Sequence, residues 1–132
     1  MIQLQSRIEE HKFKMETLKE KLQPLGYGIG GNWDYDHGYF DYKIDDDHGY
    51  HFLRLPFRTI DGEVETKGVT VELGRPFLLT HQYEEGIDDV VYNYNALFNQ
   101  FQKPVVNDAA VPNKYLETGR LLIEELEATL LT

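Results

Sequence analysis

The chain has no cysteine among its 132 residues, and it has only one tryptophan. The absence of cysteine excludes disulfide bonds, thiolate metal sites and a cysteine nucleophile, and it is usual for proteins kept in a reducing compartment. The only serine, Ser6, lies near the N-terminus and outside any strand–turn–helix elbow, so a serine triad is not expected. We therefore expect a cytosolic, cytoplasmic protein without covalent cross-links.

Positive charge is also scarce in this chain. Lys and Arg number 13 against 23 Asp and Glu, which gives a net charge of −10. A field of this sign repels the phosphate backbone that supplies most nucleic-acid affinity, so we expect no nucleic-acid partner. No stretch approaches the ~20 apolar residues that a membrane-spanning helix needs, and residues 1–11 do not resemble a secretory signal. Membrane insertion is therefore not expected.

The composition is sufficient for a packed interior. Hydrophobic residues make up 41% of the chain and aromatic residues 13%, which is well above the composition of disordered chains. At this length, folding buries roughly two-thirds of the surface that the unfolded chain exposes. The sequence therefore predicts a single domain over residues 1–132.

Two segments show the apolar periodicity of helices. A short amphipathic helix is predicted over residues 14–23, and Pro24 and Gly26 are expected to end it. A longer amphipathic helix is predicted over residues 112–130, with an apolar stripe in steps of three and four residues. The stripe consists of Leu116, Gly119, Ile123, Leu126 and Leu130. The simplest interpretation is that this stripe covers a sheet, and a glycine within it suggests close approach to the sheet or to a partner helix.

Between the two helices the period changes to two residues, which is typical of strands. Alternating runs cover residues 39–45, 50–57, 69–73 and 77–83, and turn sequences separate them. The pattern predicts an α+β fold: an antiparallel meander sheet of about four to five strands, with a short N-terminal helix and a longer C-terminal amphipathic helix packed on it. Residues 84–111 show no sustained period and are predicted to form a long excursion, a candidate site on general grounds.

Two similar hexamers combine carboxylates with an imidazole: DYDHGY at residues 34–39 has two aspartates, and DDDHGY at residues 45–50 has three. Each differs from a calcium loop in the position of its glycine and in the missing chelating glutamate, so turn chemistry explains it better. The strand between the two turns is expected to hold His37 and His48 about 24 Å apart, too far for one ion to bind both. We assign no metal and no cofactor to these turns.

Two further histidines, His51 and His81, fall in predicted strands. They could meet across the sheet if their strands are neighbours. Two histidines without a placed carboxylate make a weak metal site, however. Histidines on a half-buried sheet surface are the simpler interpretation.

Aromatic and acidic residues are concentrated around the first hexamer. Such a cluster could form a pocket for acid–base catalysis, or for a sugar or cationic ligand. The alternative is that aromatic cross-strand pairs stabilise the sheet while the acidic side chains lie on its solvent-exposed face. The candidate ligand-binding residues are Trp33, Asp34, Tyr35, Asp36, Tyr39, Asp41, His51 and His81, and no catalytic residue is assigned.

Four motifs together resemble a known family. They are GNWDYDHGYFDYK at residues 31–43, FLRLPF at 52–57, GRPFLLTHQY at 74–83 and FNQFQ at 98–102. The chain resembles the YugN-like family, small proteins of Bacillus and related bacteria, over residues 13–130. The resemblance implies an α+β fold and a bacterial cytosolic setting. It implies no activity and carries over no catalytic residue.

Two functional hypotheses remain open. The first is a non-catalytic binding or interaction domain that self-associates, since homodimers are the commonest assemblies. Its contact would be an aromatic-rich sheet face or the C-terminal helix. The alternative is a small-molecule or metal-dependent enzyme that uses the Asp34, Asp36 and Asp41 cluster, or His51 and His81.

Overall fold

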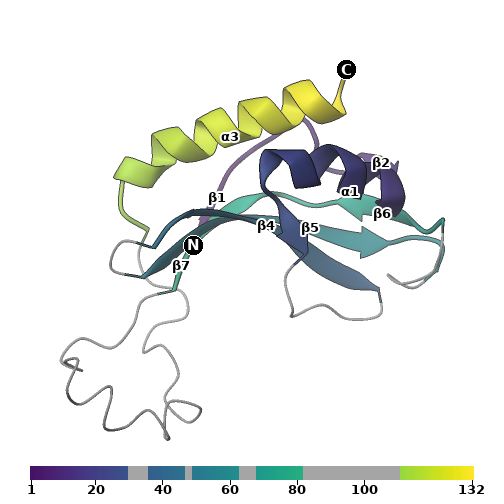
Figure 1. The fold of residues 1–132 in the computed structure, drawn as a ribbon, viewed down its shortest axis with the longest axis horizontal. Helices are drawn as coiled ribbons and strands as arrows, with labels where there is room; N and C mark the ends of the chain where they lie inside the picture. Colours follow the sequence, from purple (N-terminus) through teal and green to yellow (C-terminus); the bar gives the residue numbers. More distant parts are fainter. Residues whose placement is uncertain (30–35, 47–48, 63–67, 82–110) are drawn as a thin grey trace, which may run out of the picture.

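The computed structural model describes residues 1–29, 36–46, 49–62, 68–81 and 111–132. The elements in chain order are β1 (Ile2–Gln3), β2 (Lys12–Lys14), α1 (Met15–Leu22), the 3-10 helix η1 (Gln23–Leu25), β3 (Gly28–Ile29), β4 (His37–Asp45), β5 (Tyr50–Thr59), β6 (Thr70–Leu73), β7 (Phe77–His81) and α3 (Lys114–Leu130). The strands form one antiparallel sheet, and both α-helices lie on the same face of it (Figure 1). The predicted α+β fold class is confirmed. The excursion predicted over residues 84–111 lies outside the described residues except for Val111.

The two predicted helices form close to their expected bounds. The residues predicted to end the first helix lie directly after it: the 3-10 helix η1 contains Pro24, and Gly26 follows η1 with a left-handed φ of 105°. Glycine reaches this conformation without the steric cost that a Cβ would impose. No helix in the described part of the chain is long and apolar enough to cross a membrane.

The longest pairing of the sheet is the hairpin of β4 and β5, which runs from His37 opposite Arg58 to Asp45 opposite His51. The register shifts by one residue between Lys43 and Asp45, which marks a β-bulge. Gly38 pairs with Phe57, whereas Gly49 lies at the other end of the hairpin, directly before β5. The described residues of the two hexamers therefore lie at opposite ends of β4, as the strand pattern predicts. His48 itself lies outside the described residues.

On its other side, β5 pairs with two successive strands. β7 pairs with residues 50–54 of β5, and β6 pairs with residues 57–59. The segment 74–76, which the meander prediction treats as a turn, therefore shifts the chain along β5 without reversing it. Gly74 donates its backbone N–H to the Pro56 carbonyl at 2.9 Å, and a Cβ at Gly74 would lie only 3.1 Å from the Pro56 ring. Pro76 lies in the break between β6 and β7, and Pro56 of β5 lies opposite this break. These two prolines and the close approach of Gly74 explain why the strand is interrupted here.

The N-terminal segment adds one short strand beside β7 and another beside β6. β1 pairs with β7, and β2 pairs with β6. β1 has only two residues. β1 lies at one edge of the sheet and β3 at the other.

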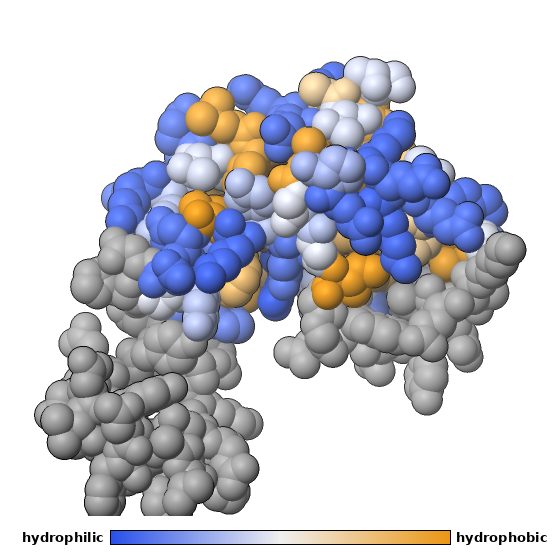
Figure 2. Space-filling model, in the orientation of Figure 1, coloured by the Kyte–Doolittle hydropathy of each residue, from blue (hydrophilic) through white to orange (hydrophobic). Residues whose placement is uncertain are grey.

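The core lies between the sheet and the two helices. Alternate residues of β5 point into it, and the buried stripes of α1 and α3 cover them (Figure 1). Its largest fully buried side chains include Ile8, Leu18, Leu22, Phe40, Leu53, Leu55, Leu73, Leu78 and Leu126. The stripe of α3 begins with buried Tyr115, while Leu116, predicted to be part of it, is half-buried. Figure 2 shows hydrophilic residues over most of the viewed side of the molecule, with smaller hydrophobic patches between them.

The glycine predicted to allow close approach does so against the sheet. A Cβ at Gly119 would lie 2.9 Å from Cδ1 of Leu4 and 3.1 Å from Cδ1 of Leu78. These distances are shorter than an ordinary van der Waals contact. The glycine therefore sets how closely α3 packs on β7 and on Leu4, the residue directly after β1.

A Gly119→Val substitution is expected to lower the free energy of unfolding by about 1–3 kcal/mol, because the added carbons overpack this contact. Ala128→Val, at an exposed position of the same helix, is the matched control and should cost only about 0.5 kcal/mol. Urea unfolding followed by circular dichroism measures both. Equal losses in the two variants would contradict the packing described here.

Candidate functional site

We call the face of the sheet that points away from the helices the outer face. It carries a group of mainly aromatic and charged side chains. Side chains of directly paired residues point to the same side of a sheet, so the register identifies the members. They are Tyr39, Asp41 and Lys43 from β4, Tyr50, Phe52 and Arg54 from β5, and Phe77, Leu79 and His81 from β7. Apart from exposed Lys43 and buried Leu79, these residues are half-buried.

A two-pronged ion pair lies at the centre of the outer face. Arg54 donates from Nε to Oδ1 of Asp41 at 2.8 Å and from Nη2 to Oδ2 at 2.9 Å. The two side chains are only 19% and 16% exposed. The guanidinium also lies 4.8 Å from the ring centroid of Tyr39, which is a cation–π contact. The central charges of the face are therefore neutralised within the chain.

Aromatic rings of β4, β5 and β7 flank this ion pair, whereas Gly28 of β3 lies opposite Asp41 on its remaining side. Phe77 meets Tyr39 edge-on with centroids 6.5 Å apart, and Phe52 contacts both Tyr50 and His81 at 6.2 and 5.8 Å. The Lys43 ammonium lies 5.0 Å from the centroid of Tyr50. The rings form an amphipathic surface that can contact apolar groups and accept cations or hydrogen-bond donors.

The structure brings together some of the sequence-predicted site residues and separates others. Tyr39, Asp41 and His81 share the outer face. Asp36 is exposed before the start of β4 and pairs with His37 Nδ1 at 2.9 Å, and this hydrogen bond lowers the pKa of Asp36. Trp33, Asp34 and Tyr35 lie outside the described residues.

His51 and His81, which could meet across the sheet if their strands were neighbours, do lie on neighbouring strands but on opposite faces. His81 pairs with Tyr50, whereas His51 pairs with Thr80. His51 therefore points toward the helices and His81 away from them. Within the described ranges, no group of three or more His, Cys, Asp or Glu side chains is arranged to hold a metal ion.

On the helix side, buried His51 belongs to a polar cluster at the start of α3. Its Nδ1 is 2.9 Å from Thr80 Oγ1, and its ring stacks on Tyr115 with centroids 4.2 Å apart. The Tyr115 hydroxyl donates to both oxygens of Asp45, at 2.8 and 2.9 Å. Burial, followed by the Asp45 hydrogen bond, raises the pKa of Tyr115. The cluster attaches the first turn of α3 to the ends of β4, β5 and β7. The sequence analysis did not predict it, because it needs three segments far apart in the chain.

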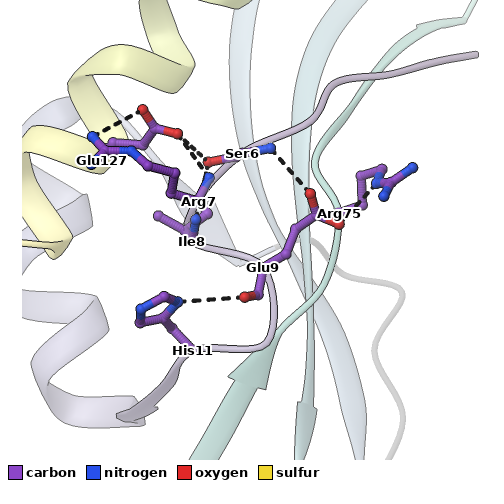
Figure 3. Close-up of polar contacts among 7 residues, drawn as sticks. All are labelled: Ser6, Arg7, Ile8, Glu9, His11, Arg75 and Glu127. Carbon is purple, nitrogen blue, oxygen red and sulfur yellow. Dashed lines mark hydrogen bonds and ion pairs between the residues drawn. The ribbon is translucent and has the colours of Figure 1, made fainter.

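A second polar cluster joins the N-terminal segment to α3 and to the segment between β6 and β7 (Figure 3). Oε2 of Glu127 accepts hydrogen bonds from Ser6 Oγ and from the Arg7 backbone N–H, both at 2.9 Å. Glu9 accepts from the Ser6 backbone N–H at 3.1 Å and from Arg75 Nε at 2.8 Å. We call these five residues the N-terminal tie. No motif marks it in the sequence, since its acceptors are ordinary glutamates.

The hydrogen bonds of the tie shift both carboxyl groups in the same direction. The Arg75 hydrogen bond chiefly lowers the pKa of Glu9, and the Arg7 backbone hydrogen bond chiefly lowers that of Glu127. Both values lie below the ordinary value of 4.5. The tie therefore depends on ionised glutamates.

The tie should make the protein less stable in acid. A carboxyl group with a lowered pKa stabilises the fold fully above its ordinary pKa, and this stabilisation is lost as the pH falls through the folded value. We expect the unfolding free energy of Glu127→Gln to fall less between about pH 5 and pH 3 than that of the wild type. Urea unfolding at a series of pH values measures this, with Glu117→Gln at an exposed site of α3 as the control. Identical pH profiles for wild type and Glu127→Gln would contradict the role of the tie.

The central ion pair should be coupled more strongly than a surface pair. A double-mutant cycle with Asp41→Ala and Arg54→Ala is expected to give a coupling of about 1–3 kcal/mol, because both side chains are largely shielded from water. Arg58 and Glu72 form a comparison pair on the same face, in which Arg58 is 68% exposed. Their coupling should remain below about 1 kcal/mol. A weaker coupling at Asp41–Arg54 than at Arg58–Glu72 would refute this ordering.

Comparison with known proteins gives one consistent assignment. The model of the YugN-like family matches residues 3–130. A Bacillus subtilis protein described as uncharacterised protein YugN is 42% identical over 133 residues, which cover 99% of both chains. Uncharacterised protein YlbA of the same organism is 26% identical over 84 residues, covering 64% of this chain and 70% of that protein.

A solved structure has the same fold. The crystal structure of an uncharacterised conserved protein YugN from Geobacillus kaustophilus HTA426 superposes with a TM-score of 0.74, over 98% of this chain and 95% of that one. Sequence identity in this superposition is 17%, so it supports the fold alone. The family match and the 42% identical relative carry the assignment further. The chain belongs to the YugN-like family.

Proposed function

We propose that this protein is a single, non-catalytic binding domain of the cytoplasm that self-associates into a homodimer through the outer face. The observation that carries the proposal is the group of aromatic side chains beside a neutralised Arg54–Asp41 pair. The proposal assigns the face to contact with a second copy. It assigns no reaction to the domain.

The residue types of the outer face support a contact role. Tyrosine, phenylalanine and arginine are enriched at the centres of protein interfaces, where they contribute much of the binding energy. Burying an unpaired arginine would be costly, but Arg54 carries its own carboxylate partner at 2.8 Å. The centre of the face can therefore be buried without leaving a charge unpaired.

The charges near the ends of the outer face are paired within the chain. Lys43 lies toward the β4–β5 turn, where its Nζ is 3.4 Å from Asp46, and Glu72 pairs with Arg58 toward the opposite end of β5. A two-fold axis in the plane of the face, perpendicular to the strands, would bring these two ion pairs of different copies together. Such an isologous contact is the usual form of a two-fold dimer.

The size of the face fits a weak dimer. Strands of 9 and 10 residues form its centre, and at ~3.4 Å per residue they are about 30 Å long. Three strands at ~4.8 Å each give a width of about 14 Å. The resulting flat area of roughly 400 Å², enlarged by protruding side chains, lies below the ~800 Å² per partner of a standard interface, so the proposed association is concentration-dependent.

The enzyme alternative depends on convergence of Asp34, Asp36 and Asp41, or of His51 and His81. The two histidines lie on opposite faces of the sheet. Both oxygens of Asp41 accept hydrogen bonds from Arg54, and Asp36 is exposed and paired with His37. The candidate residues that the structure describes therefore give no specific support to an enzyme.

Sedimentation velocity over a concentration series tests the proposal. The wild-type mass should rise from 15.4 kDa toward twice that value as concentration increases. Phe52→Glu, which places a charge in the aromatic surface, should remain a monomer. Leu121→Glu is the matched control at an exposed site of α3 and should associate like the wild type.

Two results would contradict the proposal. One is a wild type that stays monomeric at the highest concentration. The other is a Phe52→Glu variant, folded by circular dichroism, that associates as strongly as the wild type. If Leu121→Glu alone were monomeric, the contact would lie on α3 and not on the outer face.

A further inference from the structure

The edge strand β1 and the residues after it present unpaired backbone groups on the side away from β7. Ile2 lies opposite Leu78, and Leu4 donates its N–H to the Pro76 carbonyl at 2.9 Å. Backbone groups of alternate residues in an antiparallel strand point to opposite sides, so those of Gln3 and Gln5 point away from β7. No hydrogen bond among the described residues uses the N–H or carbonyl of Gln3 or Gln5.

A hollow lies directly beside this backbone edge. It has a volume of about 420 Å³, and the segment Gln3–Gln5 faces Arg120, Ile123 and Glu124 of α3 across it. A second hollow of about 410 Å³ shares Gln5 and Glu127 with the first and extends toward Glu9 and Arg75. The two hollows form a groove along the edge, with α3 as its wall. A strand that pairs with Gln3 and Gln5 would place side chains in this groove.

The N-terminal tie holds the edge in place. Figure 3 shows Ser6 between Glu127 and Glu9, with hydrogen bonds to both. These bonds fix the chain directly after Gln5 to α3 on one side and, through Arg75, to the sheet on the other. The groove is therefore formed before any partner binds, which reduces the entropy that binding must overcome.

The rim of the groove carries three exposed arginines, although the protein as a whole is acidic. The side chains of Arg7, Arg120 and Arg75 are 76%, 68% and 43% exposed, and they pair with Glu127, Glu117 and Glu9 at 3.5, 3.9 and 2.8 Å. Glu124 is a further exposed acid in the lining. Each guanidinium still has N–H groups that no described group accepts, and these can bind carboxylates.

We propose that this edge binds an extended peptide segment with acidic side chains from a partner protein. The peptide adds a strand beside Gln3 and Gln5, its acidic side chains contact the three arginines, and an apolar side chain enters the hollow near Ile123. Edge addition of this kind obtains affinity from backbone hydrogen bonds and specificity from alternate side chains. The surface is separate from the outer face, so the inference does not depend on the proposed homodimer.

The test is an amide NMR titration of the full chain with the synthetic peptide acetyl-(Glu-Val)₃-amide. We expect the largest shifts at the amides of Gln3 and Gln5. A peptide of the same sequence with every residue N-methylated, which cannot donate from any position, should bind at least 5-fold more weakly. Arg120→Glu should also weaken binding at least 5-fold, whereas Arg58→Glu on the outer face should leave it unchanged.

A second variant addresses the backbone directly. Gln5→Pro removes an N–H that no described group accepts, so the fold should persist by circular dichroism while peptide binding falls at least 5-fold. If this variant unfolds, the N-methylated peptide and Arg120→Glu still decide the question.

Three outcomes would overturn the inference. The first is no shift at Gln3 and Gln5 with millimolar peptide. The second is equal binding of the N-methylated peptide, which would indicate charge attraction without strand addition. The third is concentration-dependent broadening of these two amides without peptide, which would make a second copy the occupant of the edge.

Discussion

The pairing of β5 on both of its sides is the constraint on which the rest of the structure depends. β4 pairs with it along one side, and β7 followed by β6 pairs with it along the other. Its alternate residues supply Leu53 and Leu55 to the core and Phe52 and Arg54 to the outer face. A slip of one residue would exchange these two sets and bury the arginine against the helices. The core and the candidate contact surface are therefore fixed by the same register.

One side of β5 pairs with two successive strands, β7 and β6, and this arrangement gives the N-terminal segment its structural role. Because β6 and β7 are offset along β5, β1 and β2 extend different halves of the sheet, and the chain between them crosses the division. Ile8 fills the core at this crossing, while Glu9 and Glu127 hold the segment to Arg75 and to α3. The N-terminal segment thus joins helix to sheet and also forms the edge that faces the groove.

Local patterns predicted the elements of this fold well, but they could not predict which elements meet. The alternation in β4 and β5 and the stripe of α3 follow directly from periods of 2 and 3.6 residues, and both are present. The short strands β1, β2 and β3 have two or three residues each, too few to establish a period. The Asp45–Tyr115 and Ser6–Glu127 contacts join residues 70 and 121 positions apart, and no local signal specifies them. Of the predicted site residues, His51 and His81 show the problem most clearly, since their separation depends on a pairing between β5 and β7 that the sequence does not reveal.

Native-state hydrogen exchange of the backbone amides tests the central role of β5 most directly. Hydrogen-bonded amides of β5 should exchange only through global unfolding, with protection equal to the unfolding free energy, because neighbours on both sides must open together. Amides of the edge strands β1 and β3 should exchange through smaller openings. Exchange of the β5 amides at the rate of the β1 amides would show that the sheet is not organised around β5 and would contradict the account of both faces.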